Sequence, residues 1–194
     1  MAKTTQVKIL ENAQDLFWSK GHKATSLDQI AQKTGQSKGA IFHYFRNKDD
    51  ITKLVLEHYA QRELYTPLER GFDGQNNVKN GLLCWVEGIY AGFSKRNYHS
   101  GCLLGNMALE LADQDEEIRQ DIAKIFLDWE NQLVGLLKSH AKDGQLLMEP
   151  RQLARLIIAG LQGITMTIKV HKDKNRAARE FQALGELIER LIKD

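Results

Sequence analysis

The chain has 194 residues, of which 42% are hydrophobic and 27% are charged, and its net charge is +2. These proportions are ordinary for a globular protein. Its only prolines are Pro67 and Pro150, and so few helix breakers favour a helical chain. No run approaches the roughly 18 apolar residues that a membrane span needs, and no apolar signal sequence is apparent. We therefore expect a cytoplasmic protein without membrane association.

Cysteine and histidine give no sign of a metal or cofactor site. Cys84 and Cys102 lack the spacing of zinc ligands and cannot make a disulfide framework, so we expect reduced thiols. The six histidines are not spaced as metal ligands, and no phosphate-binding loop or nucleophile motif occurs. We expect no metal, no cofactor and no enzymatic activity.

Charge is unevenly distributed along the chain. The first 48 residues carry eight lysines and arginines against three acidic residues, so the remaining 146 residues are net negative. A basic N-terminal segment on a mildly acidic body indicates that this segment meets a polyanion. An accidental distribution of surface charge is the alternative that this pattern leaves open.

Apolar residues recur at helical spacing in both halves of the chain, and no alternating strand pattern occurs. The N-terminal half predicts helices at residues 5–20, 27–34, 38–44 and 48–65, the last ended or kinked by Pro67. Ser26 with Gln29 forms a capping-box pattern, and Ser37 is a good N-cap for the third helix. The C-terminal half predicts helices at about residues 77–95, 101–112, 115–142, 150–172 and 177–192.

Residues 25–48 carry the motif that indicates function. Two short helices joined by a tight glycine-containing turn make a helix-turn-helix. Gly39 and Ala40, at the start of the second helix, are small enough to let its N-terminus approach another molecule closely. In a helix-turn-helix that molecule is DNA, and the approach is to the major groove.

This segment resembles the TetR family of bacterial repressors. The family pattern is Thr, then Ile-Ala, Gly-x-Ser-x-Gly, Tyr-x-Tyr-Phe and Lys. It appears here as Thr25, Ile30-Ala31, Gly35, Ser37, Gly39, Phe42-His43-Tyr44-Phe45 and Lys48. Phe42 replaces the common tyrosine at a position that we expect to be partly packed. The resemblance implies an all-α fold: a three-helix helix-turn-helix DNA-binding domain at residues 1–48, and a helical ligand-binding and dimerisation domain at residues 49–194.

The resemblance also implies a set of DNA contacts, namely Thr25, Ser26, Ser37, Lys38, Gly39, His43, Tyr44 and Lys48. Hydroxyl, phenol and ammonium groups suit the phosphates, and Lys38 and His43 are the side chains available to read bases. Lys48 begins a helix, where the helix dipole would also attract a phosphate. Thr25 and Ser26 can instead be helix caps, and Tyr44 can be core.

Because a single helix-turn-helix makes few contacts, we expect a homodimer that doubles them on a palindrome. The resemblance implies that the last two helices form a four-helix interface with those of the partner. The interface residues we predict are Leu153, Ile157, Gly160, Leu161, Ile164, Phe181, Leu184 and Ile188. The alternative is that these residues fill the core of one protomer.

Large, soft side chains in the middle helices predict a pocket for a small-molecule inducer. They are Trp85, Ile89, Phe93, Cys102, Met107, Phe126, Trp129 and Met166. The same residue types fill ordinary cores, so the pocket depends on the family resemblance and not on the pattern.

Cys102 follows Gly101 at an expected helix start, where backbone N–H groups stabilise a thiolate. Some TetR-type repressors that respond to electrophiles carry a similar Gly-Cys-Leu at this place. Two interpretations stay open: a sensor more reactive than Cys84, or a buried, inert residue. Cys84, beside Leu83 and Trp85, is expected in the core.

Together these features predict a homodimeric repressor that binds a palindromic double-stranded DNA operator and is released by a small-molecule inducer, with an electrophile as one possibility. The alternative is a helical ligand-binding protein or adaptor that does not bind DNA. Binding to duplex DNA that weakens steeply with salt separates the two.

Overall fold

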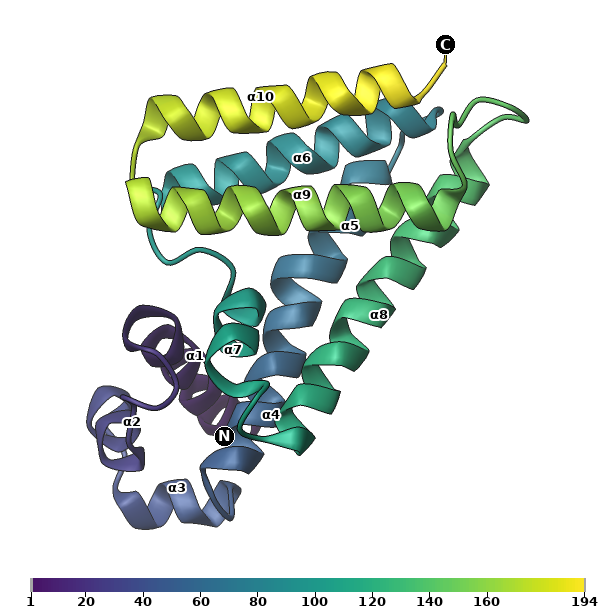
Figure 1. Ribbon diagram of the computed structural model, residues 1–194. Coiled ribbons are helices and arrows are strands. Elements are labelled where there is room, and N and C mark those ends of the chain that lie inside the picture. The colour runs from purple at the N-terminus through teal and green to yellow at the C-terminus, as the bar shows by residue number, and fades with distance from the viewer. Residues whose placement is uncertain (1, 194) are drawn as a thin grey trace. The chain divides into compact units, whose positions relative to one another are not determined.

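The computed structural model describes the backbone of residues 2–193 and the side chains of residues 5–193. Within that range the chain is helical, and its one extended pairing is an isolated bridge between Leu146 and Ile192, so the predicted all-α fold is confirmed (Figure 1). The elements in chain order are α1 (Ala2–Lys20), α2 (Leu27–Thr34), α3 (Lys38–Tyr44), α4 (Lys48–Tyr59), η1 (Ala60–Tyr65), α5 (Thr66–Phe72), α6 (Val78–Lys95), α7 (Leu103–Leu111), α8 (Glu116–His140), α9 (Pro150–His171) and α10 (Lys174–Leu191).

The helix boundaries agree with the prediction to within about three residues, except after α4. We expected a single helix over about 48–65 that Pro67 would end or kink, and its expected extent is wrong because α4 ends at Tyr59. The α-helical pattern passes into the π-helical segment η1, and Pro67 then lies in the first turn of α5. A proline is tolerated there because the first turn of a helix does not use its backbone N–H groups.

The chain divides into two compact units, one made of Met1–Gln61 with Leu103–Ile125 and the other of Arg62–Cys102 with Phe126–Asp194. The first unit therefore holds α1 to α4, α7 and the beginning of α8. The boundary that we expected after Lys48 falls at the start of α4, inside this unit. As a division between DNA-binding and ligand-binding functions, it stays a prediction.

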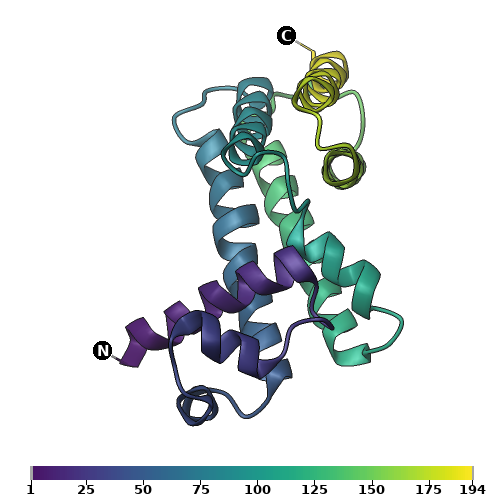
Figure 2. The same cartoon turned by 90° about the vertical axis from the view of Figure 1, so that its left-hand side faces the viewer.

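The first unit is built around α1, which packs against α2, α4 and α7 (Figure 2). Its buried apolar side chains include Phe17, Ile30 and Ile51. The predicted capping box is present: Ser26 Oγ accepts the Gln29 N–H at 3.2 Å, and Gln29 Oε1 accepts the Ser26 N–H at 2.8 Å. These caps fix where α2 begins, and with it the geometry of the helix-turn-helix.

In the second unit, α6 packs closely against α5, and α10 packs against both α6 and α9 (Figures 1 and 2). Two glycines make the first contact possible. A Cβ added to Gly71 would lie 2.4 Å from Trp85 Cβ, and one added to Gly81 would lie 2.4 Å from Phe72 Cδ1. A side chain at either position would force α5 and α6 apart.

Helix α9 is the one described helix whose length and mean hydropathy would suit a membrane span, which the sequence analysis did not anticipate. Seven of its residues are buried along one face, including Leu153, Ile157 and Leu161. That one-sided burial is typical of a core helix.

Candidate nucleic-acid interface

Helix α3 is the centre of the candidate interface. Its first turn is capped by Ser37, whose Oγ accepts the Ala40 N–H at 3.1 Å. Ile41 is fully buried and anchors one side of the helix, whereas the opposite side is exposed. The exposed residues are Lys38, Gly39, Phe42 and His43. The helix is therefore anchored on one side, and its exposed side offers a cation, two rings and, at Gly39, no side chain. Such a surface suits the major groove of DNA.

The two predicted base readers both lie on this surface. Lys38 is paired with Asp28 of α2 at 2.9 Å, and because the pair is exposed it is weak enough to be exchanged for a contact with DNA. His43 packs edge-on against Tyr44, with ring centroids 5.0 Å apart. Tyr44 is half-buried, so its ring supports His43 while part of it remains accessible.

Phe42 corrects one expectation. We expected a partly packed side chain at this position, but Phe42 is 47% exposed. An exposed phenylalanine on this helix is an apolar surface where sequence reasoning had placed none, and apolar side chains contact the methyl group of thymine. Because it is exposed, Phe42 is a candidate for contact with DNA, which the motif did not indicate.

The start of α2 places its two predicted phosphate contacts differently. Ser26 is exposed and its hydroxyl is the N-cap, so a cap and a phosphate contact remain compatible there. Thr25 is only 1% exposed, and its Oγ1 donates to the Gly21 carbonyl at 2.8 Å. The predicted contact between the Thr25 hydroxyl and a phosphate does not fit this burial, and the side chain instead fixes the turn after α1.

Lys48 likewise turns inward. Its Nζ donates to the carbonyl of His22 and lies 5.8 Å from the centroid of the Phe17 ring. Burial lowers the pKa of Lys48, with the Glu110 carboxylate opposing that shift. The predicted phosphate contact does not fit a side chain so engaged: Lys48 ties the start of α4 to the loop that follows α1.

The same loop is held by Glu110 of α7, a residue that sequence reasoning missed. Its carboxylate accepts the backbone N–H groups of His22 at 3.0 Å and Lys23 at 2.6 Å. Lys23 Nζ also donates to the side-chain oxygen of Gln114. We call these four residues the α7 clamp. Glu110 is 88 residues from His22 in the sequence, so no local signal could have predicted the contact.

The His22 side chain completes this loop. Its Nε2 lies 2.8 Å from Thr52 Oγ1 of α4, and its ring packs against Phe17 with centroids 5.0 Å apart. Burial, with a smaller contribution from the Lys48 ammonium, lowers the pKa of His22 to about 4. The imidazole is therefore neutral near pH 7 and acts as a packing residue.

Two family models match the chain over these regions. Residues 9–55 match bacterial regulatory proteins of the tetR family, and residues 81–184, more than half of the chain, match the tetracyclin repressor-like C-terminal domain. The chain belongs to the TetR family. The resemblance inferred from residues 25–48 is thus confirmed, and the chain is a transcriptional regulator of that family.

Curated relatives span nearly the whole chain. An HTH-type transcriptional regulator of Lactococcus lactis subsp. lactis, encoded in the lacX 3' region, is 28% identical over 193 residues, which cover 97% of this chain and 95% of that protein. The HTH-type transcriptional repressor NemR of Escherichia coli K12 is 24% identical over 177 residues, or 87% of this chain and 86% of NemR.

Solved structures of TetR-family regulators share the fold. The reduced form of Escherichia coli NemR has a TM-score of 0.84 at 21% identity, covering 98% of this chain and 97% of that one. A TetR-family regulator from Agrobacterium tumefaciens has a TM-score of 0.85 at 19% identity and is covered completely in both directions.

The dimer residues that we predicted in this TetR-family chain mostly face the interior of the protomer. Six of the eight are buried in the second unit of the protomer itself: Leu153, Ile157, Leu161, Phe181, Leu184 and Ile188. Gly160 faces Leu184 within the same protomer, and Ile164 is half-buried. These six residues are protomer core, the alternative that the sequence had left open.

A second apolar stripe on α9 is exposed instead. Its residues are Leu156, Ala159, Gly163, Met166 and Val170, spaced by three and four along the helix. Val170 is 70% exposed, and Leu187 of α10 is also exposed. We call these six residues the α9–α10 stripe. Met166, which we had assigned to the ligand pocket, belongs to this surface.

The other predicted pocket residues are mostly core. Trp85, Phe93 and Trp129 are buried in the second unit, and Trp85 meets Trp129 edge-to-face at 6.0 Å. Met107 is buried in the first unit, whereas Ile89 and Phe126 are half-buried. The pocket formed by these eight residues stays a prediction.

One polar feature near these aromatic residues stands out. Among the described side chains, the Trp129 Nε1–H donor and the Gln132 Oε1 acceptor are buried without a hydrogen-bond partner. They lie three residues apart on α8, in the second unit. Buried polar groups nearly always have a partner, so this donor and acceptor are free to bind water or a ligand.

One of the two cysteines does not lie where we expected it, and the other is buried, as one of its two open interpretations had it. Cys84 is exposed and Cys102 is buried, so the expected core position of Cys84 is wrong. Cys102 directly precedes α7, and the Gln162 Nε2–H donates to its Sγ at 3.5 Å. A turn with three left-handed non-glycine residues, Asn97, Tyr98 and Ser100, leads into Gly101 and Cys102. Burial makes Cys102 the less accessible of the two thiols.

Proposed function

We propose that this TetR-family regulator is a repressor that binds a palindromic DNA operator as a homodimer in the cytoplasm and leaves it when a small molecule binds. The observation that carries the proposal is the exposed face of α3. Lys38 and His43 read bases, Gly39 allows close approach, and Phe42 adds an apolar contact. A helical ligand-binding protein or adaptor would have no use for this surface within a basic N-terminal segment.

The contact set that we propose is smaller than the one expected from the sequence. Ser26, Ser37 and Tyr44 contact phosphates, because each lies at or near the surface beside α3 or at the start of α2. Thr25 and Lys48 hold the framework from inside. This division predicts that the two inner residues affect stability, whereas the surface residues affect DNA affinity.

The α9–α10 stripe is the dimer interface in this proposal. Two-fold symmetry places the same stripe of both protomers face to face, and Gly163 has open space where a side chain would stand, so the partner helix can approach closely. The dimer then presents two copies of α3 to successive major grooves.

The inducer site that we favour is around Trp129 and Gln132 of α8. A ligand that offers an acceptor to the indole N–H and a donor to the amide oxygen would satisfy both groups within an aromatic surrounding. An electrophile that reaches Cys102 is the second candidate, favoured by the position of this thiol directly before α7, whose Glu110 holds the loop after α1.

The test is a binding-site selection from a randomised duplex followed by fluorescence anisotropy across a salt series. Wild-type affinity for the selected site should fall steeply with salt. Lys38→Ala and His43→Ala should each lose roughly 1–3 kcal/mol at one base position per half-site, whereas Lys124→Ala, a matched exposed lysine on α8, should not. No salt-dependent duplex binding, or an unchanged consensus for both variants, would refute the proposal.

A further inference from the structure

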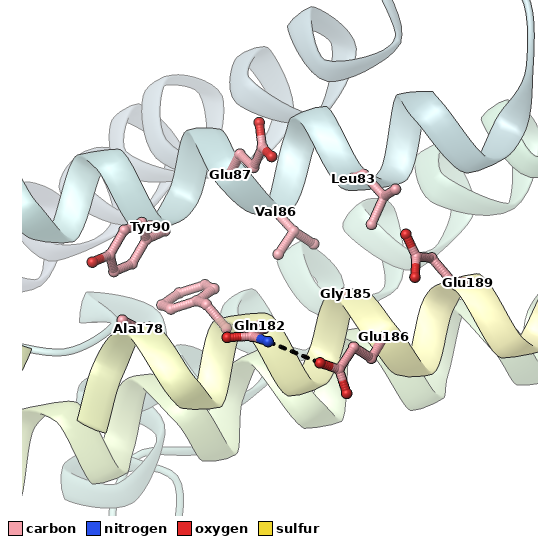
Figure 3. A pocket seen from close by; sticks show the side chains of 10 residues that line it. Leu83, Val86, Glu87, Tyr90, Ala178, Gln182, Gly185, Glu186 and Glu189 are labelled. Carbon is pink, nitrogen blue, oxygen red and sulfur yellow. Dashed lines mark hydrogen bonds between the residues drawn. The ribbon is translucent and has the colours of Figure 1, made fainter. Parts of the chain in front are cut away.

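Helices α6 and α10 enclose a groove of about 400 Å³ in the second unit (Figure 3). Its apolar lining comes from both helices: Leu83, Val86 and Tyr90 from α6, and Ala178 and Phe181 from α10. None of the residues that we predicted for the inducer lines it. The groove is therefore a separate feature that the proposed function does not use.

The two ends of the groove differ in chemistry. Figure 3 places Tyr90 and Ala178 towards one end and Leu83 and Glu189 towards the other. At the first end, the rings of Tyr90 and Phe181 pack with centroids 5.4 Å apart. Glu186 also lies towards the Leu83 end, whereas Glu87 lies between the two ends (Figure 3). The groove thus has an aromatic end and an end that carries Glu186 and Glu189.

Three carboxylates border the groove, from Glu87 of α6 and from Glu186 and Glu189 of α10. Within the part of the chain that the structure describes, none of the three makes an ion pair. Gln182 donates to Glu186 Oε1 at 2.9 Å, which leaves the charge of that carboxylate in place. No lysine or arginine is among the groove-lining residues. The groove therefore presents uncompensated negative charge beside apolar surface.

We propose that this groove binds an organic cation with an elongated apolar body. The carboxylates of Glu186 and Glu189 attract the cationic head, and the face of an aromatic ring at the other end accepts the body or a second cation. By helix geometry, α6 advances about 10 Å from Leu83 to Tyr90, which matches an alkyl or aryl amine of about ten heavy atoms in length. An anionic amphiphile of the same shape would meet repulsion from all three carboxylates.

The experiment is a calorimetric titration of the full-length protein, without DNA, with decyltrimethylammonium below its micelle concentration. Decyl sulfate and decyl maltoside serve as anionic and neutral probes with the same tail. We expect the cation to bind, to bind more weakly as salt rises, and to exceed both other probes in affinity at least tenfold. Equal affinity for the three probes would show a merely apolar surface and overturn the proposal.

Two variants locate the site. Glu186→Gln combined with Glu189→Gln should lower the affinity for the cation about tenfold. The matched control is Glu57→Gln with Glu117→Gln, which removes two exposed charges from the first unit and should change nothing. Unchanged affinity in the groove variant, or an equal loss in the control, would contradict the assignment.

A filling variant gives a second, independent test. A Cβ at position 185 would lie 3.5 Å from Leu83 Cδ2, an ordinary contact, so Gly185→Leu is tolerated and its side chain occupies the groove. Leucine also favours the helix more than glycine does, so α10 should keep its fold. Cation binding should be lost with the melting temperature maintained, and binding that survives would overturn the proposal. Because no DNA is present, failure here is distinct from failure of the repressor proposal.

Discussion

Replacing Glu110 by glutamine tests whether the α7 clamp holds the loop after α1. The carboxylate accepts two backbone N–H groups, those of His22 and Lys23, at 3.0 and 2.6 Å. Hydrogen bonds to a charged group contribute about 1.5–3 kcal/mol each, and neutral ones about 0.5–1.5 kcal/mol. Glu110→Gln keeps the shape but loses the charge and replaces one of the two acceptor oxygens, which bind different N–H groups, with an N–H donor. Both bonds lie close to solvent. We therefore expect the free energy of unfolding to fall by about 1–2 kcal/mol.

Glu110→Ala removes both acceptors and should cost more, roughly 2–3 kcal/mol. The assay is equilibrium unfolding in urea followed by circular dichroism, at one fixed protein concentration because a dimer unfolds in a concentration-dependent way. Glu117→Gln, at an exposed position on α8, is the matched control and should lie within about 0.5 kcal/mol of wild type. If Glu110→Gln behaved like this control, the α7 clamp would be a surface contact that contributes nothing measurable to the free energy of unfolding.

Three further predictions concern assembly, pH and thiol reactivity. Met166→Glu in the α9–α10 stripe should raise the dimer dissociation constant about 30-fold or more, whereas Leu127→Glu, an equally exposed site on α8, should leave it unchanged in sedimentation experiments. Because the pKa of His22 is lowered to about 4 in the folded state, its contribution to stability is present above pH 6.5 and is lost as the pH falls from 6.5 towards 4. His22→Gln should therefore reduce the change in the free energy of unfolding over this pH range by roughly 1–2 kcal/mol after solvent screening. An unchanged pH profile would contradict this. Iodoacetamide should label exposed Cys84 before buried Cys102 in the native protein, as mass spectrometry of partially alkylated samples would show; faster labelling of Cys102 would restore the sensor interpretation.

Local features of the fold could be predicted from the sequence because their causes are local. The cap at Ser37 and the capping box of Ser26 with Gln29 each involve residues three positions apart, and both form as expected. The recognition surface of α3 also follows from a short motif. In contrast, the pattern could not show that Thr25 faces inward, because a helix cap and a buried hydroxyl use the same residue type.

Features that depend on distant partners gave no sequence signal. Glu110 is one of many glutamates on exposed helix faces, and only the fold brings it to the backbone of His22. Lys48 fitted a phosphate contact by position, but the carbonyl of His22 and the ring of Phe17 are its partners. Cys84 was misplaced for a related reason: an apolar neighbour such as Trp85 does not determine which way the adjacent residue points.

Helix α9 shows why a dimer surface cannot be assigned from the sequence pattern alone. Two apolar stripes run along it, one through Leu153, Ile157 and Leu161, the other through Leu156 and Met166. Periodicity cannot say which stripe a protomer buries by itself, and we chose the first. The structure buries the first stripe and leaves the second without cover.

The two stripes also account for the high mean hydropathy of α9, which would suit a membrane span on composition alone. A helix that is apolar on both sides must be covered on both sides. The core of the protomer covers one, and in our proposal the same helix of a partner covers the other. The charges support this arrangement: Arg151 and Arg155 of α9 both bind Glu130 of α8, so the helix is attached within its own protomer by an ionic contact that a lipid environment would disfavour. Dimerisation thus explains a composition that the protomer alone leaves unexplained.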